Sequence, residues 1–307
     1  MPLTQSIQWR TPAVQDGAMT TVGAVYLPQF PPERLRSVAR AADGAGLDQL
    51  WLWEDCFWES GLATAAAALA WTERLQVGVG LLPVPLRNAA ITAMELATLH
   101  KLFPGRPVVG VGHGVQDWMG QVGARVGSPL TLLREQLDAL RALLAGREVS
   151  TTGRYVRLDR VRLDKPPEPT PPVLAGAGGP HTLRLVGGHA DGVILTAGTT
   201  PAELTRAREL VEEGRAEAGR PDPLLVVVYL FAAGGPGARA RVDAELARWG
   251  RSASPDQAVA GSAAEVAAQA ARWVEAGADT VVLQPTEGDD PEAFVAFAAE
   301  VGRELAG

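Results

Sequence analysis

Two acidic side chains stand next to each other among aromatic residues in the segment 51–59, WLWEDCFWE. Glu54 and Asp55 directly follow a short β-rich run of the chain. Apolar surroundings raise the pKa of a carboxyl group and favour proton exchange or hydrogen bonding to a polar heterocycle. Glu54 and Asp55 are therefore candidate catalytic residues, and Asp55 is also a candidate for contact with a bound ligand. In the alternative interpretation the aromatic side chains cap the core and both acids face water.

A single histidine lies between two glycines in the segment 110–119, GVGHGVQDWM. Gly112 and Gly114 leave space for a planar ligand against bare backbone, and His113 can donate a proton or a hydrogen bond near neutral pH. A lone histidine is usually structural, so a structural role remains the alternative to catalysis by His113. Contact with a ligand is expected of all three residues.

The segment 80–88, GLLPVPLRN, combines a glycine near the end of a β-rich run with two prolines. Glycine at such a place often marks a bulge or a close approach of the backbone to a ligand, so we expect a strained or bulged peptide at Gly80–Leu81. Arg87 is the polar candidate here, because its guanidinium can bind a phosphate or a carboxylate in bidentate fashion. A loop stiffened by proline is the structural alternative.

A run of small residues precedes a helical segment at 175–182, AGAGGPHT. Gly176, Ala177, Gly178 and Gly179 would expose backbone N–H groups in front of Pro180, a residue favoured in the first turn of a helix. This arrangement suits phosphate binding at a helix N-terminus. A tight connection between a strand and a helix also needs glycine, so the run has a structural explanation as well.

The sequence lacks the motifs of several hydrolase classes. It contains no zinc-type spacing of His and Cys, no Gly-x-Ser-x-Gly turn and no Walker-type loop. No metal site is therefore expected. The absence of an evident nucleophile favours an enzyme in which a bound cofactor performs the chemistry while the protein supplies shape, orientation and electrostatics.

Short β-rich runs alternate with longer amphipathic runs along the chain, which is the pattern of parallel strands joined by helices. Eight β-rich runs are present: 21–27, 49–53, 75–82, 108–112, 171–178, 190–198, 224–231 and the end of 265–285. Helical runs include 31–46, 89–103, 128–145 and 291–305. We therefore predict an α/β protein with a (β/α)8 barrel, or TIM barrel, in which the strand ends gather the candidate residues at one mouth.

The chain is expected to form a single domain over 1–307. The segments 147–171 and 234–260 are predicted insertions, because neither is followed by an independent set of core-forming elements. An open doubly wound sheet is disfavoured, since LPQFPPE rather than a Gly-x-Gly-x-x-Gly turn follows the first strand.

Composition excludes several classes of function. The formal net charge of −7 and the absence of a basic stripe argue against nucleic-acid binding. The only cysteine, Cys56, cannot form an internal disulfide, which favours the cytoplasm. The N-terminal segment has no signal-peptide pattern, and no apolar run reaches the roughly 18 residues of a membrane span.

The ordered motifs resemble those of the bacterial luciferase-like superfamily, in particular its actinobacterial deazaflavin-dependent branch. The resemblance covers nearly the whole chain and is carried by TVGAVYLP, DGAGLDQLWLWED, LQVGVGLLPVPLRNAAITAMELATLHKLFPGR, VVGVGHGVQDWM, PVLAGAGGPHTLRLVGGHADGVIL and EAGADTVVLQP. It implies a homodimer or higher homo-oligomer of barrels that binds coenzyme F420 or a flavin with the ring deep in the mouth.

The resemblance also implies roles for particular residues. A non-prolyl cis peptide near Gly80–Leu81 would support the ring, and the segment 176–179 would cradle the ribityl-phosphate side. Asp55 corresponds to the aspartate after the second strand. Several relatives follow it with a histidine where this chain has Cys56, which argues against a sugar-phosphate dehydrogenase.

The expected function is hydride transfer between coenzyme F420 and an organic small molecule. An FMN-dependent monooxygenase is the alternative, because reduced FMN reacts with O2 and a 5-deazaflavin does not; a non-catalytic flavin-binding barrel is a third. Trp53, Phe57, Trp58 and Trp118 suggest an apolar substrate, unless they pack the insertions. The expected cofactor contacts are Asp55, Gly80, Leu81, Arg87, Gly112, His113, Gly114, Gly176, Ala177, Gly178 and Gly179.

Overall fold

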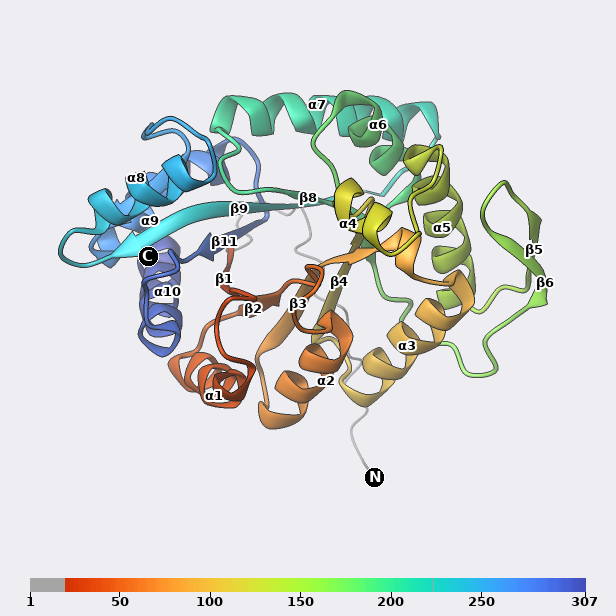
Figure 1. Cartoon of the computed structure of the whole chain (residues 1–307), viewed down its shortest axis with the longest axis horizontal. Coiled ribbons are helices and arrows are strands. Elements are labelled where there is room, and N and C mark those ends of the chain that lie inside the picture. Colours follow the sequence, from red (N-terminus) through yellow and green to blue (C-terminus); the bar gives the residue numbers. More distant parts are fainter. Residues whose placement is uncertain (1–19, 223) are drawn as a thin grey trace.

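The computed structural model describes residues 20–222 and 224–307, and it shows a closed parallel barrel surrounded by helices (Figure 1). Within these residues eight strands form the ring, and β9 pairs with both β8 and β11 to close it. Around the barrel the strands are β1 (Thr21–Tyr26), β2 (Gln49–Leu52), β3 (Gln76–Pro83), β4 (Pro107–Gly112), β7 (Val173–Gly176), β8 (Gly192–Leu195), β9 (Leu225–Gly234) and β11 (Thr280–Gln284). The expected (β/α)8 fold is confirmed. The N-terminal segment 1–19, for which the sequence predicts no signal peptide, lies outside the described residues.

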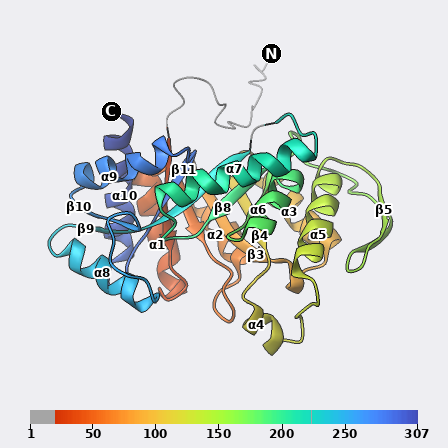
Figure 2. The same cartoon turned by 90° about the horizontal axis from the view of Figure 1, so that it is seen from above.

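Helices connect the strands on the outside of the ring (Figure 2). They are α1 (Leu35–Ala45), α2 (Gly61–Trp71), α3 (Ala89–Leu102), α5 (Pro129–Leu144), α6 (Pro180–His189), α7 (Pro201–Glu217), α9 (Ala263–Glu275) and α10 (Pro291–Ala306). Several begin where a side chain accepts a backbone N–H, as Ser128 does for α5 and Thr200 and Ser262 do in capping boxes. None of the helices in the described part of the chain is long and apolar enough to cross a membrane.

The first predicted insertion, 147–171, holds a two-stranded antiparallel hairpin of β5 (Val149–Thr152) and β6 (Arg157–Val161). Figure 1 shows this hairpin outside α5. Glu135 of α5 anchors it, because its carboxylate accepts the backbone N–H groups of residues 154–156 at 2.8–2.9 Å. The hairpin is therefore attached to the outer helices, away from the barrel interior.

The second predicted insertion, 234–260, contains regular structure that the sequence did not indicate. It holds α8 (Ala238–Arg248) and most of β10 (Ala258–Gly261), which pairs in parallel with the end of β9. The sheet has a ninth strand beside the ring of eight: β9 continues past the ring, and its last residues, Phe231 to Gly234, offer a free edge that β10 covers. Between β4 and α5 the chain adds a short helix, α4 (Gln116–Gln121).

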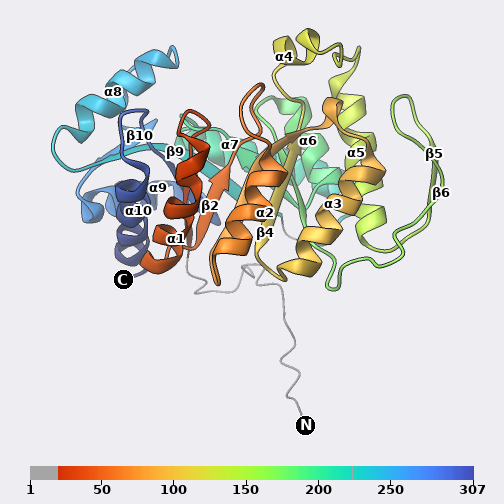
Figure 3. The ribbon, with the colours of Figure 1, turned by 60° about the horizontal axis from the view of Figure 1, so that its bottom comes forward.

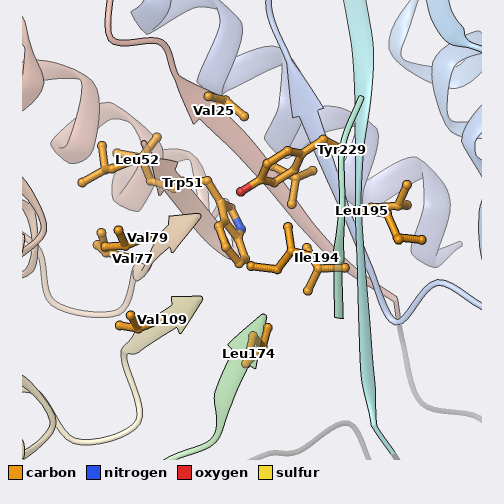
Figure 4. Packing of buried hydrophobic residues seen from close by; sticks show 14 of the residues in the cluster. Val25, Trp51, Leu52, Val77, Val79, Val109, Leu174, Ile194, Leu195 and Tyr229 are labelled. Carbon is orange, nitrogen blue, oxygen red and sulfur yellow. The ribbon is translucent and has the colours of Figure 1, made fainter. Parts of the chain in front are cut away.

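Trp51 of β2 fills the centre of the barrel and is fully buried. Glycines make room for it: a Cβ on Gly23 or Gly78 would lie within 3.0 Å of the indole, closer than real Cβ atoms approach. Its N–H donates to Gln49 Oε1 at 2.9 Å. Figure 4 shows Trp51 and Tyr229 together inside a ring of aliphatic side chains from the other strands. The interior is thus a packed core and not a pore.

The N-terminal ends of the strands surround a cavity of about 1020 Å³. Its charged lining groups largely pair with one another: Asp191 accepts from Arg141 at 2.9 Å and from Arg220 at 2.8 Å. In this fold the N-terminal face serves stability, whereas reactive groups lie at the C-terminal ends of the strands. Figure 3 shows α4 and the loop after β2 projecting from the C-terminal end of the barrel.

Candidate active site

The Gly80–Leu81 peptide on β3 is cis, and the pairing of β3 with β4 shifts register between Val79 and Leu82. The irregularity expected at Gly80–Leu81 is therefore confirmed. A second non-prolyl cis peptide joins Cys56 and Phe57 in the loop after β2, and nothing in the sequence pattern indicated it. Both peptides lie toward the C-terminal ends of neighbouring strands, where the mouth forms.

The side chain of Leu81 lies over two glycines of the adjoining strands. A Cβ on Gly112 of β4 or on Gly176 of β7 would come within 3.0 Å of Leu81 Cδ2, so a side chain at either position would push the leucine aside. The space expected for a planar ligand against the bare backbone of Gly112 is taken by Leu81 in the structure. Leu81 is half-buried, so part of its side chain forms the surface of the mouth here.

Three aromatic side chains form a column inside the barrel below the mouth. Trp51 and Tyr229 meet edge to face with ring centroids 5.7 Å apart, and Trp53 lies 6.0 Å from Tyr229. The Trp53 indole N–H and the Tyr229 hydroxyl are buried and interact with each other, although the contact is not a well-formed hydrogen bond. Both groups are therefore polar atoms in an otherwise apolar column below the mouth.

Strand β11 ends in another buried donor. Gln284 is 2% exposed, and its Nε2 has no hydrogen-bond partner within the described residues. Thr280 of the same strand lines the interior at the opposite end, and strand alternation places Gln284 on that same inner face. Neither Gln284 nor Tyr229 is among the candidate site residues predicted from the sequence. The signal available for both was an inward position in a strand of apolar residues.

Asp55 enters the barrel mouth above the aromatic column. Every second residue of this segment faces the interior: Trp51 and Trp53 both contact Tyr229, and Asp55 is the next inward position. Burial raises the pKa of Asp55 to about 6, and no hydrogen bond to its carboxylate offsets the desolvation. Burial also raises the pKa of Tyr229, and the negative charge of Asp55 adds to that rise. The Asp55 carboxyl group can therefore exchange a proton close to neutral pH.

Glu54 turns away from Asp55 toward the outer helices. Its carboxylate accepts from Arg87 Nη2 at 2.7 Å and from the backbone N–H of Gly61, the first residue of α2, at 2.9 Å. Arg87 also binds Glu95 of α3 at 3.0 Å. In the structure the bidentate partner of Arg87 is therefore Glu54, and the Glu54 carboxylate is occupied by these contacts.

His113 follows β4 and connects it to α6. Its Nε2 lies 3.2 Å from the Thr182 hydroxyl, and the ring also interacts with the backbone carbonyl of Pro129. Burial lowers the pKa of His113, which keeps the ring neutral near pH 7. The adjacent Gly114 has a φ of +66° and faces Pro83 and Met119, so local packing accounts for that glycine.

The turn before α6 is open. Gly178 and Gly179 are exposed, and a Cβ on either would meet nothing within 4 Å. Gly179 is the N-cap of α6, and no side chain caps the first turn. The free N–H groups of this turn carry a partial positive charge that favours an anion. Ala177, by contrast, donates its N–H to Ile194 O at 3.2 Å and is already paired.

The aromatic residues around the mouth divide into two sets. Phe57 and Trp58 are 63% and 56% exposed, so they do not cap the core. Trp53 and Trp118 are half-buried. Among the described residues no group of three or more His, Cys, Asp or Glu side chains could hold a metal ion.

The fold of the described residues defines a (β/α)8-barrel protein. The family model described as luciferase-like monooxygenase matches residues 7–278, and the chain belongs to this family. The resemblance carried by the strand-end motifs is thereby confirmed.

Curated relatives carry names from deazaflavin chemistry. A 5,10-methylenetetrahydromethanopterin reductase of Methanolobus tindarius is 29% identical over 69% of this chain and 64% of its own length. An F420-dependent glucose-6-phosphate dehydrogenase of Nakamurella multipartita is 31% identical over 62% of this chain and 60% of its own length. The matched region thus spans less than two thirds of either relative.

Solved structures share the fold at lower identity. An F420-dependent secondary alcohol dehydrogenase in complex with an F420-acetone adduct superimposes with a TM-score of 0.82, 22% identity, and coverage of 94% of this chain and 99% of that one. The oxygenating constituent of 3,6-diketocamphane monooxygenase from Pseudomonas putida, in complex with FMN, gives 0.75 and 18% identity, with coverage of 94% and 98%. These likenesses establish the architecture.

Proposed function

We propose that this protein transfers a hydride between coenzyme F420 and an organic small molecule. The observation that carries the proposal is the buried polar lining of the barrel mouth: Gln284 Nε2 has no hydrogen-bond partner among the described residues, and the Asp55 carboxyl group is buried with its pKa raised to about 6. Together with the uncapped turn before α6, they fit a heterocycle that carries an anionic tail. The names of the curated relatives support the choice of F420.

Particular residues would hold such a cofactor. Gly80 and Leu81 would support the ring, and the exposed N–H groups at Gly178 and Gly179 would bind a phosphate. The deazaflavin itself supplies the carbon that accepts or gives up the hydride. Arg87 is left out of this set, because Glu54 and Glu95 already neutralise it.

Two side chains would manage protons during the reaction. Asp55, with its pKa near 6, can take the proton that a substrate hydroxyl loses or return it to a carbonyl oxygen. Burial keeps His113 neutral near pH 7, and its Nε2 lies beside the Thr182 hydroxyl, so the ring can donate or accept a hydrogen bond at the ligand. The buried surroundings exclude water, which strengthens both interactions.

An FMN-dependent monooxygenase is the second candidate function. The description of the matched family and the FMN complex among the similar structures favour it. The same mouth would then hold a flavin that reacts with O2. A non-catalytic flavin-binding barrel is the third candidate function, and it would bind the cofactor without turning it over.

One experiment separates these functions. The purified protein is titrated with F420 and with FMN by absorbance, and oxygen uptake is then followed with each reduced cofactor. We expect F420 binding, and reoxidation of reduced F420 only when a carbonyl compound is present, without oxygen uptake. Tight FMN binding with oxygen uptake and no F420 affinity would establish the monooxygenase, whereas cofactor binding without any turnover would establish the non-catalytic barrel.

We further propose that the protein acts as a homo-oligomer in the cytoplasm. Helix α3 carries three large apolar side chains exposed to solvent, Ile91, Met94 and Leu102, at 52%, 54% and 64%. Burial of such a stripe against a second copy would remove apolar surface from water. Light scattering should show a dimer or larger assembly, and Ile91→Lys should weaken it.

A further inference from the structure

The hydroxyl of Tyr229 has no role in the proton transfers described above, although it lies directly below the mouth. Tyr229 comes from the middle of β9 and is 4% exposed. Its hydroxyl interacts with the Trp53 side chain, although the contact is not a well-formed hydrogen bond. The hydroxyl oxygen also has a steric consequence for the neighbouring strand β3.

The Tyr229 hydroxyl occupies the space that a side chain at position 80 would need. A Cβ on Gly80 would lie well within 3.0 Å of Tyr229 Oη, and it would lie 3.1 Å from Cε3 and Cζ3 of Trp51. Trp51 fills the corresponding space at Gly78. Strand β3 is therefore supported from inside the barrel by one aromatic residue of β2 and one of β9.

The other side of the same peptide is fixed by Leu81. Its side chain lies against Gly112 and Gly176, where an added Cβ would displace it. The Gly80–Leu81 peptide is thus held between the Tyr229 hydroxyl on the inside and two neighbouring strands beside it. Because barrel interiors are close-packed, removal of one atom from this contact shifts the peptide instead of leaving it in place.

We propose that Tyr229 is a positioning residue: its hydroxyl oxygen sets the height of the Gly80–Leu81 peptide and hence the surface on which the cofactor ring rests. The inference depends on the proposed function, because it presumes that a ring binds there. It assigns Tyr229 a steric role and no contact with substrate. The electrostatic influence of Asp55 on Tyr229 agrees with a place beside the reacting groups.

Two single variants and their combination test the proposal. Tyr229→Phe removes the hydroxyl oxygen, and Gly80→Ala inserts a methyl group into the space of that oxygen. In the double variant the methyl group replaces the oxygen. We expect Tyr229→Phe to fold as the parent does, since phenylalanine keeps the ring that packs against Trp51. We expect the dissociation constant for F420 to rise about tenfold in Tyr229→Phe and more in Gly80→Ala.

The double variant decides between explanations. The methyl group introduced at position 80 then takes the place of the missing oxygen, so the dissociation constant should return to within about threefold of the parent value. Tyr155→Phe, in the loop between β5 and β6, removes a hydroxyl that binds Ser128 N at 2.8 Å and should leave F420 affinity unchanged. The KM for the cofactor should follow the dissociation constant, while kcat changes by less than about threefold.

Three results would overturn the positioning role. Recovery of the melting temperature without recovery of affinity in the double variant would show a purely structural contact. A double variant as weak as Tyr229→Phe would show a polar contact with the ligand, and unchanged affinity in both single variants would show that the peptide height is irrelevant. Failure of the proposed function is recognised earlier, because the parent protein would then either bind no F420 or bind it without any turnover.

Discussion

The guanidinium of Arg87 binds the carboxylate of Glu54 through Nε at 3.1 Å and Nη2 at 2.7 Å. This pair joins the loop after β3 to the segment after β2, and its side chains are only 17% and 12% exposed. Asp55 is the next residue along the chain. The ion pair therefore fixes the backbone from which Asp55 enters the barrel.

Removal of Arg87 should destabilise the fold. Arg87→Ala leaves the Glu54 carboxylate in a largely buried place with Gly61 N–H as its remaining partner, which we expect to lower the free energy of unfolding by about 3 kcal/mol. Urea unfolding measures this loss. Arg125→Ala is the control, because Arg125 and Asp117 are 54% and 93% exposed and their pair is worth less than about 1 kcal/mol. Similar small losses in both variants would contradict the structural role of the Arg87 pair.

Asp55→Asn should stabilise the protein at alkaline pH. Burial raises the pKa of Asp55 from 3.8 to about 6, so the folded state binds the proton more tightly than the unfolded state. Ionisation of Asp55 therefore lowers stability as the pH rises from about 4 through 6, and asparagine removes that penalty. We expect a gain of up to about 3 kcal/mol at pH 8 and none at pH 3.5, measured by denaturant unfolding.

The same variant should be a poor enzyme. Loss of the positioned acid–base group should slow deazaflavin oxidation or reduction roughly 100-fold in stopped-flow absorbance, although the fold is kept. Asp117→Asn, at a carboxylate that is 93% exposed, is the control and should change neither stability nor rate. Unchanged deazaflavin kinetics in Asp55→Asn would remove Asp55 from the mechanism.

A bulky residue in the turn before α6 should impair cofactor binding more than folding. Gly178→Val and Gly179→Val place side chains in open space, so the melting temperature should change little, while access of a phosphate to the N–H groups of the turn is blocked. We expect the cofactor dissociation constant to rise at least about tenfold, which corresponds to 1.4 kcal/mol. Gly44→Val, on the outer helix α1 and also in open space, should leave affinity unchanged. Parallel losses of stability and affinity would favour a tight turn without a binding role.

The contact between His113 and α6 should matter for binding. Thr182→Val removes the hydroxyl that lies 3.2 Å from His113 Nε2 while it keeps the shape of the side chain. A lost hydrogen bond of about 1 kcal/mol should weaken cofactor affinity about fivefold in a fluorescence titration. Thr182→Ser keeps the hydroxyl and should bind as the parent does; equal weakening in both variants would attribute the effect to packing alone.

The sequence by itself determined the barrel and the identity of its mouth. Alternation of β-rich and helical runs reflects local periodicity, and the first four strands begin and end within one residue of their expected bounds. The irregular peptide at Gly80–Leu81 was predictable for the same reason, because a glycine at a strand end is a local signal.

Only the tertiary structure decided which candidate groups remain free. Arg87 and Glu54 are 33 residues apart, and their pairing depends on how two loops meet, which no local pattern encodes. The same holds for Leu81, whose side chain fills the space above Gly112 and Gly176 on other strands. Tyr229 looked like an ordinary residue of a buried strand; its hydroxyl gained a role because closure of the barrel brings β9 against Gly80. Residue types and spacing are local properties, whereas the occupancy of a site depends on contacts between distant segments.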